Sequence, residues 1–277
     1  MYHNMQLVRD IIWEKEEHTD YGRLYFCSNE PLELLFNNFS VEGKDVLTVL
    51  GSSDQLFHTI DRGANTVDTF DRNPYTKYYY YLRRWNILYN QKYYITDDFF
   101  RTHFPIVELL CRVECQSEEE EDAYSFWRKY INTIFPFENY DFFYHCSRRN
   151  YVDHMETFKD KLASFHPTFY LMDIYKENNI PKQYDIIITS NMFEYVRRKP
   201  YKIELGRDHL KSLLKDNGKI IASHMVHGKG DPYFEKEVEI YSNDFTYEEF
   251  PWYENPVFHY EHPVGYSYTK KMSTKNS

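Results

Sequence analysis

An apolar run that ends in a glycine turn constrains the fold of this chain more than any other feature. Residues 45–50 begin with Asp45 and continue as a mostly apolar run of β-branched residues and leucine, and Gly51 follows them directly. A segment of helical character covers residues 54–62, and a second apolar run over 66–71 ends on the carboxylate of Asp71. This order predicts a strand, a tight turn, a helix and a second strand, which is the repeating unit of a parallel α/β sheet.

The same alternation continues along the chain. Further strands are expected at residues 168–173, 184–191 and 219–223, and again at 238–241, 257–260 and 266–269 at the sheet edge. Helices are expected at residues 74–89, with Pro74 in the first turn, and from about 205 to 215, before the stop signal Asn217-Gly218. Strands that alternate with helices imply right-handed crossovers, so we predict a Rossmann-like, doubly wound α/β fold with a mostly parallel sheet.

Two segments are additions to this pattern. Residues 1–40 are expected to form an N-terminal helical lid, in which a helix follows Pro31. Residues 91–167 form a long helical insertion before the third strand, with helical stretches at 106–115, 122–135 and 151–165. We predict one domain over residues 1–270, followed by a disordered tail at 271–277.

The composition limits the partners. With a net charge of −10 over 277 residues, the chain lacks the basic face that phosphate contacts need, so no nucleic-acid partner is expected. The basic clusters at residues 83–84, 148–149 and 197–199 are most simply solvated helix faces and loops. No segment reaches the roughly 18 apolar residues of a transmembrane helix, and the four cysteines show no disulfide spacing, so a cytoplasmic protein is expected. Cys111 and Cys115 lack a second ligand pair, and no metal site is predicted.

The loop after the first strand indicates the kind of ligand. Gly51 permits a close approach to the backbone, and Ser52, Ser53 and Asp54 then offer backbone N–H groups at a helix start. Dinucleotide-binding loops carry three glycines, which let a pyrophosphate lie against the helix. One glycine favours a ligand without phosphates, and S-adenosylmethionine is the common one. The alternative is a tight turn that binds nothing.

Two carboxylates at strand ends fit the same ligand. Asp71, followed by Arg72, can accept hydrogen bonds from both ribose hydroxyls; the alternative is a helix N-cap before Pro74. Asp173 can accept from the exocyclic amine of adenine while Ile174 packs on the ring, although Asp173 is equally suited to a cap. The methionyl group would then lie beside the glycine loop.

Together these motifs resemble class I S-adenosylmethionine-dependent methyltransferases, over about residues 45–95 and 168–226. A closer similarity is to the betaine-lipid-synthesis enzymes that transfer a 3-amino-3-carboxypropyl group from S-adenosylmethionine to diacylglycerol. The shared segments are the loop at residues 51–54 (GSSD), residues 71–74 (DRNP) and residues 190–195 (SNMFEY). The chain departs from that family by lacking a second loop glycine and by carrying Phe-Glu where Pro-Asp is expected.

The resemblance also implies which residues face the reactive sulfonium. Ser190 is expected to contact the cofactor, Asn191 to hold an amine or hydroxyl of the acceptor, and Glu194 or Tyr195 to remove a proton. The alternative is that Ser190 and Asn191 cap the next helix.

His224 and His227, just past the fifth strand, are further candidates for a general base, although histidines at strand ends are more often structural. The expected function is an S-adenosylmethionine-dependent transferase, most simply a methyltransferase acting on a small, modified or lipid-like molecule. The alternatives are aminocarboxypropyl transfer and a non-catalytic adenosyl-binding protein. An NAD-dependent oxidoreductase would need the phosphate loop that is missing. The acceptor and the oligomeric state have no signal in the sequence.

Overall fold

The computed structural model describes residues 28, 30–90, 117–134, 155–225, 227–250 and 264–272. Its contacts divide the chain into two compact units. The first unit combines Met1–Asn29, Leu50–Asp61 and Asp71–His166, and the second combines Glu30–Val49, Arg62–Phe70 and Pro167–Ser277. Most of the predicted lid, the helix expected at 106–115, the strand expected at 257–260, the Cys111–Cys115 pair and most of the expected tail lie outside the described residues.

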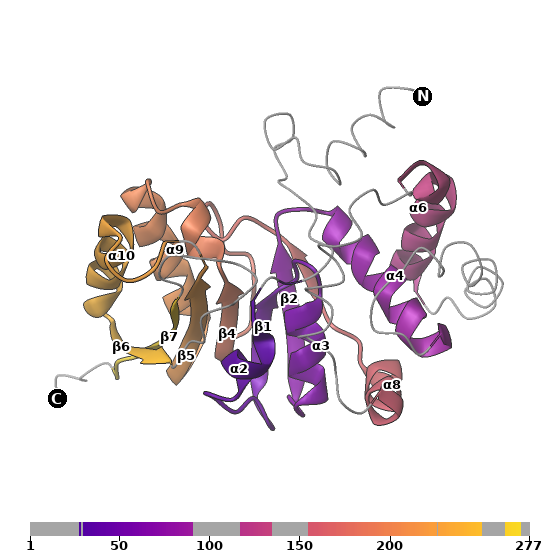
Figure 1. Cartoon of the computed structure of the whole chain (residues 1–277), viewed down its shortest axis with the longest axis horizontal. Coiled ribbons are helices and arrows are strands. Elements are labelled where there is room, and N and C mark those ends of the chain that lie inside the picture. Colours follow the sequence, from indigo (N-terminus) through magenta and orange to yellow (C-terminus); the bar gives the residue numbers. More distant parts are fainter. Residues whose placement is uncertain are drawn as a thin grey trace. The chain divides into compact units, whose positions relative to one another are not determined.

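The second unit is built on a seven-stranded sheet with the order β3-β2-β1-β4-β5-β7-β6 (Figure 1). The strands are β1 (Asp45–Val49), β2 (Thr66–Asp71), β3 (Phe169–Leu171), β4 (Tyr184–Ser190), β5 (Leu214–His224), β6 (Phe245–Phe250) and β7 (Val264–Lys270). β1 pairs in parallel with β2 and β4, and β4 pairs in parallel with β5, whereas β7 is antiparallel to β5 and β6. The predicted Rossmann-like α/β fold with a mostly parallel sheet is therefore confirmed.

The central strands form because their residues are apolar on both faces. Leu47 of β1 lies opposite Ile187 of β4, and Ile187 lies opposite Ile220 of β5; all three side chains are fully buried. Parallel strands that are covered on both faces have such continuous apolar runs. The core continues into β7, where Tyr268 stacks on Tyr241 with 4.4 Å between ring centroids.

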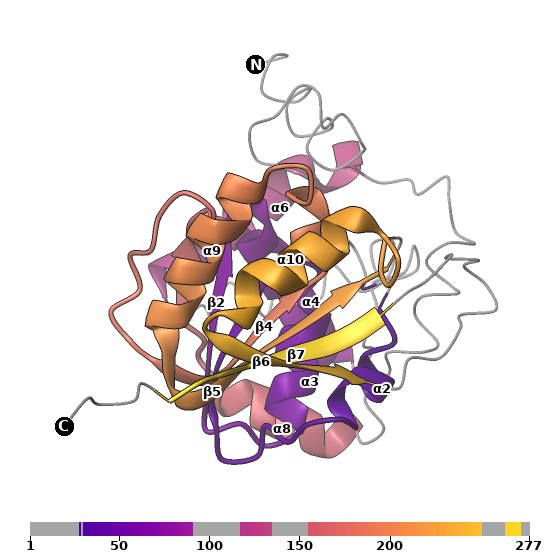
Figure 2. The same ribbon diagram turned by 90° about the vertical axis from the view of Figure 1, so that its left-hand side faces the viewer.

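Among its described residues, the second unit contains the helical elements α2 (Leu32–Phe36), the 3-10 helix η3 (Met192–Tyr195), α9 (Pro200–Leu213) and α10 (Pro232–Ser242). Figure 2 shows α9 and α10 side by side on one face of strands β5 to β7. α2 follows Pro31 as the sequence predicted. α9 begins five residues before the predicted start, because Pro200 is suited to the first helical position.

The prediction of a strand over residues 238–241 was wrong, since this segment lies within α10. Asp231 caps the helix by accepting a hydrogen bond from the Tyr233 backbone N–H at 2.8 Å, and a proline occupies the first turn. Phe234, Glu237 and Tyr241 are buried at spacings of three and four residues, which is the period of one helix face.

The first unit contains α3 (Asp54–Asp61), α4 (Tyr75–Asn90), α6 (Glu118–Ile134) and α8 (Met155–Ser164). Two indole N–H groups join α4 to α6: Trp127 Nε1 donates to the Tyr78 carbonyl at 2.7 Å, and Trp85 Nε1 donates to Glu120 at 2.9 Å. The helices expected at 122–135 and 151–165 are thus present as α6 and α8, and the second packs on α3 and α4. In the described part of the chain, no helix has the length and apolar character needed to cross a membrane.

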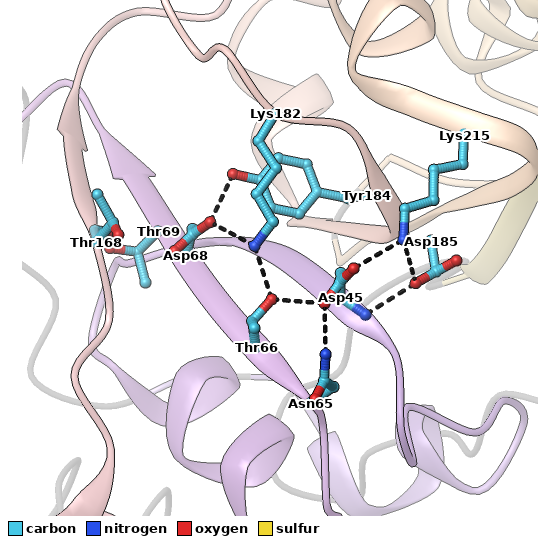
Figure 3. A network of polar contacts seen from close by, with 10 residues as sticks. All are labelled: Asp45, Asn65, Thr66, Asp68, Thr69, Thr168, Lys182, Tyr184, Asp185 and Lys215. Atoms are coloured by element: carbon cyan, nitrogen blue, oxygen red, sulfur yellow. Dashed lines mark hydrogen bonds and ion pairs between the residues drawn. The ribbon is translucent and has the colours of Figure 1, made fainter.

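A network of polar side chains connects the amino ends of β1, β2 and β4 with the start of β5 (Figure 3). Lys215 Nζ lies 2.8 Å from Asp45 Oδ2 and 3.0 Å from Asp185 Oδ2. A second lysine, Lys182, lies 3.1 Å from Asp68 Oδ2. The hydrogen bond from Lys215 lowers the pKa of Asp45 well below its usual range. Paired charges therefore hold the starts of four strands together.

Candidate functional site

The loop after β1 has an open and strained backbone. Gly51 has φ +47°, and a Cβ added there would meet nothing within 4 Å among the described residues. Ser53 has φ +71°, a left-handed conformation that is uncommon for a residue other than glycine. Its side chain is fully buried, and its Oγ has no hydrogen-bond partner among the residues that the structure describes. Strained residues of this kind are typical of ligand-binding loops.

A buried ion pair holds this loop from within the first unit. Arg83 Nη1 lies 2.8 Å from Asp54 Oδ1, and both side chains have no exposed surface. Asp54 Oδ2 also accepts hydrogen bonds from the Ser28 backbone N–H at 2.6 Å and from Ser52 Oγ at 2.8 Å. Asp54 thus faces into the loop, and Arg83 is buried where the sequence suggested a solvated charge. The sequence signal that was missed is the placement of Arg83 among apolar and aromatic residues of one helix.

Asp71 connects the end of β2 to the glycine loop. Its Oδ2 accepts the Gly51 backbone N–H at 2.9 Å, and its Oδ1 accepts the Asn73 backbone N–H at 2.9 Å. Asn73 Oδ1 accepts the Tyr75 N–H at 2.9 Å, so Asn73 caps α4 in place of Asp71. Burial raises the pKa of Asp71, and the two backbone hydrogen bonds oppose this only in part. Each carboxylate oxygen retains a further lone pair for a ligand. Arg72, the next residue, is exposed.

Asp173 and Ile174 lie in a turn of the second unit. Asp173 Oδ1 accepts the Tyr175 backbone N–H at 3.1 Å, and its Oδ2 lies 3.7 Å from Lys176 Nζ. Ile174 is packed in the hydrophobic core, and its carbonyl oxygen lies 2.7 Å from His209 Nδ1. Both residues therefore have structural partners, as the capping alternative anticipated for Asp173. Their roles toward a ligand stay predictions.

The end of β4 is tied to a glutamate that the sequence did not single out. Ser190 has φ +55°, and its Oγ donates a hydrogen bond to Glu30 Oε2. Ser223 of the neighbouring strand β5 donates to Glu30 Oε1, and Glu30 is 2% exposed. Asn191 precedes η3 but makes no side-chain cap hydrogen bond. No local pattern could have identified Glu30, because its partners lie 160 and 193 residues away.

Glu194 and the histidines after β5 form a second polar group in this unit. Glu194 Oε1 accepts the His227 backbone N–H at 3.0 Å and lies 3.8 Å from His224 Nδ1. His224 is fully buried, so it cannot contact an acceptor directly as a base. Tyr195 is half exposed.

The structure brings part of the predicted set together within each unit. In the first unit, hydrogen bonds connect the loop after β1 to the end of β2. The predicted residues that they bring together are Gly51, Ser52, Ser53, Asp54 and Asp71. In the second unit, Ser190 and Asn191 lead directly into η3, which carries Glu194 and Tyr195. Asp173 and Ile174 lie in a different turn of that unit.

No known protein family model matches this chain, and no curated protein sequence matches it. Solved structures with a similar arrangement exist. The N-methyltransferase NodS from Bradyrhizobium japonicum, in complex with S-adenosyl-L-homocysteine, shares 7% identity over 87% of this chain and 84% of that chain, with a TM-score of 0.44. A TehB-like SAM-dependent methyltransferase from Corynebacterium glutamicum shares 9% identity over 88% and 89%, with a TM-score of 0.44. A methyltransferase from Pyrococcus furiosus shares 9% identity over 98% of both chains, with a TM-score of 0.45. Likeness of this degree does not identify a ligand for this chain.

Proposed function

We propose that this chain is an S-adenosylmethionine-dependent transferase, and most simply a methyltransferase acting on a small or lipid-like acceptor. The hydrogen bond between the Gly51 backbone N–H and the Asp71 carboxylate carries the proposal. This hydrogen bond holds a carboxylate, which can accept further hydrogen bonds, beside the open backbone of Gly51. Both residues lie at the ends of two neighbouring parallel strands. Ligands of open parallel sheets bind at such carboxyl ends.

Asp71 suits the ribose of an adenosyl ligand. Its carboxylate can accept up to four hydrogen bonds, and two backbone N–H groups use one position on each oxygen. The two ribose hydroxyls are donors that fit the remaining positions. Because burial raises the pKa of Asp71, additional donors stabilise the ionised carboxylate more here than they would in water.

The charge of the loop favours a ligand without phosphates. Arg83 contacts the loop at the Ser52 carbonyl, but its guanidinium is fully buried and is paired with Asp54. Its charge is therefore neutralised inside the loop, where a pyrophosphate could not use it. Ser53, whose buried Oγ has no partner among the described residues, adds a hydroxyl that a polar group of the ligand can satisfy.

Residues 190–195 include the side chains that we assign to the acceptor. When bound, S-adenosylmethionine provides an electrophilic carbon on a sulfonium, so alignment of the acceptor accounts for much of the rate. In this proposal Asn191 orients an amine or hydroxyl of the acceptor, and Glu194 takes its proton. Tyr195, which is half exposed, contacts the body of the acceptor.

Thermal shift and calorimetry with S-adenosylhomocysteine test the cofactor directly. We expect millimolar S-adenosylhomocysteine to raise the melting temperature of the wild type and of Asp216→Asn, which changes an exposed carboxylate in the first part of β5. Asp71→Asn should lose this effect. An unshifted wild type, or stronger stabilisation by NAD, would refute the proposal.

The nucleoside product distinguishes the two transfer reactions. Methyl transfer releases S-adenosylhomocysteine, whereas the aminocarboxypropyl transfer suggested by residues 190–195 releases 5′-methylthioadenosine. Mass spectrometry after incubation with a cell extract identifies which one accumulates. Binding without either product would indicate an adenosyl-binding protein without chemistry.

A further inference from the structure

His224, the last residue of β5, lies between two carboxylates. Its Nε2 lies 2.8 Å from Glu237 Oε2 on α10, and its Nδ1 lies 3.8 Å from Glu194 Oε1 on η3. His224 and Glu237 have no exposed side-chain surface, and Glu194 is 11% exposed. Nδ1 has no hydrogen-bond partner among the described residues. A buried imidazole is thus fixed on one side and faces a more accessible carboxylate on the other.

Glu237 anchors the imidazole. Besides His224, it binds two tyrosine hydroxyls of β7, with Oε1 2.6 Å from Tyr266 Oη and 3.1 Å from Tyr268 Oη. An ionised carboxylate can only accept hydrogen bonds, so each of its three partners must donate one. His224 therefore carries a proton on Nε2 and donates it to Glu237. The ring also contacts Phe234 at 5.0 Å and Tyr266 at 5.9 Å between centroids, so it cannot turn freely.

The orientation of Nε2 has a consequence for Nδ1. If Nδ1 carries no proton, its lone pair faces the lone pairs of an ionised Glu194 at 3.8 Å, and the two repel. One proton between Nδ1 and Glu194 removes this repulsion. The resulting imidazolium would lie between two carboxylates, which balance its charge although it is buried.

We propose that His224 is a positioning residue that carries a proton on Nδ1 beside Glu194 and so keeps this carboxylate ionised. This inference rests on the proposed function in one respect, which is the assignment of Glu194 as the group that deprotonates the acceptor. The imidazolium of His224 faces Glu194 through Nδ1 and stabilises its ionised form, while Glu237 balances the imidazolium charge through Nε2. Glu194, the more accessible of the two carboxylates, takes the proton of the acceptor and releases it to solvent after product release.

Other charged groups near His224 are held by their own partners. His227 Nδ1 lies 3.4 Å from Asp231 Oδ2, and its backbone N–H is the group that contacts Glu194. Glu30 receives the hydroxyl of Ser223, the residue before His224. Burial raises the pKa of Tyr266 well above its ordinary value, so this hydroxyl stays a donor to Glu237. The protonation of His224 is therefore expected to respond chiefly to Glu194 and Glu237.

Nitrogen-15 NMR of the histidine side chains at pH 7 tests this inference without cofactor or acceptor. We expect Glu194→Gln to move the His224 Nδ1 resonance toward that of an unprotonated nitrogen. Glu237→Gln should instead remove the constraint on Nε2 and change the tautomer. The control is His209, whose Nδ1 lies 2.7 Å from the Ile174 carbonyl oxygen and whose resonances should not move.

Assignment uses the signal that is lost in His224→Gln, or, if that variant does not fold, the contacts of His224 with the Tyr266 ring. Glu194→Gln changes a partly exposed side chain and is expected to fold. An Nδ1 resonance that is the same in the wild type and Glu194→Gln would overturn the inference, because it would make His224 a purely structural donor to Glu237. Failure of S-adenosylhomocysteine to bind would refute the proposed function and leave this result standing.

Discussion

Asp45 begins β1 and Asp71 ends β2, and the two carboxylates are held in opposite ways. The Asp45 carboxylate accepts hydrogen bonds from Lys215 at 2.8 Å, from Thr66 and from Asn65. The hydrogen bond from Lys215 lowers the pKa of Asp45. Asp71 receives backbone N–H groups, and burial raises its pKa. The amino ends of the strands therefore compensate their charges with lysine, whereas the carboxyl end of β2 keeps a carboxylate that a ligand can still stabilise.

The two shifts act on stability with opposite signs. A lowered pKa means that the ionised Asp45 favours the folded state above about pH 4, and that this contribution is lost as the pH falls further. A raised pKa means that the folded state holds the Asp71 proton more tightly than the unfolded chain does. Ionised Asp71 therefore lowers the free energy of unfolding at neutral pH, and this cost disappears as the pH falls through its raised pKa.

The largest effect is expected where the loop after β1 is held by buried charge. Arg83→Met leaves the Asp54 carboxylate buried without its cation, which should lower the free energy of unfolding by about 3 to 5 kcal/mol. Urea denaturation at pH 7 measures this change. The control is Lys236→Met, which breaks the exposed Lys236–Glu239 pair of 2.8 Å and should cost no more than about 0.5 kcal/mol. Equal losses in both variants would show that the buried pair does not hold the loop.

The next effect concerns binding at Asp71. Loss of charged hydrogen bonds to the ribose in Asp71→Asn should cost about 2 kcal/mol, which is roughly a 30-fold increase in the Kd of S-adenosylhomocysteine. Wild-type affinity should also weaken on acidification, with a midpoint above the ordinary aspartate value of about 3.9. Calorimetry between pH 7 and pH 4 checks both. A Kd that is independent of pH in this range and unchanged in Asp71→Asn would remove Asp71 from the site.

The fold was predictable where local sequence decides the structure. The strands β1 and β4 are continuous apolar runs, which parallel strands require, and their glycine and serine ends mark where they stop. The segment at 238–241 is too short and too apolar for its period to separate helix from strand. The deciding signal was the Asp231-Pro232 cap seven residues upstream.

The candidate site was predictable only in its local part. Gly51 and Asp71 are identified by their positions after strands, and the structure joins them by a hydrogen bond. Glu30 and Arg83 acquire their roles from contacts with residues far away in the chain, and no local pattern encodes these contacts. Burial, which changes Arg83 from a solvated charge into half of an ion pair, is a property of the packed unit.

A smaller effect is expected at the amino ends. Lys215→Met removes the cation shared by Asp45 and Asp185, and because Lys215 is 38% exposed the loss should be only about 1 kcal/mol at pH 7. The difference should shrink toward pH 3, as the aspartates become protonated in the unfolded chain. Urea denaturation at the two pH values measures it, with Lys219→Met on the same strand as the control. A difference that persists at pH 3 would assign the loss to packing of the lysine stem.

The smallest effect is expected at two residues with positive φ, Ser53 in the candidate ligand loop and Asn217 away from it. Ser53→Gly and Asn217→Gly both relieve a positive φ, of +71° and +60°, and each should change the free energy of unfolding by no more than about 1 kcal/mol, in the stabilising direction. Asn217 is exposed in the irregular first part of β5, so its substitution should leave the Kd of S-adenosylhomocysteine unchanged. Ser53→Gly removes the buried hydroxyl that lacks a partner among the described residues, and should weaken binding by about fivefold. Denaturation and calorimetry on the same two variants measure both quantities. If both variants bind S-adenosylhomocysteine equally well, the positive φ of Ser53 serves only the geometry of the turn. The difference between the amino ends and the carboxyl ends of the strands would then rest on Asp71 alone.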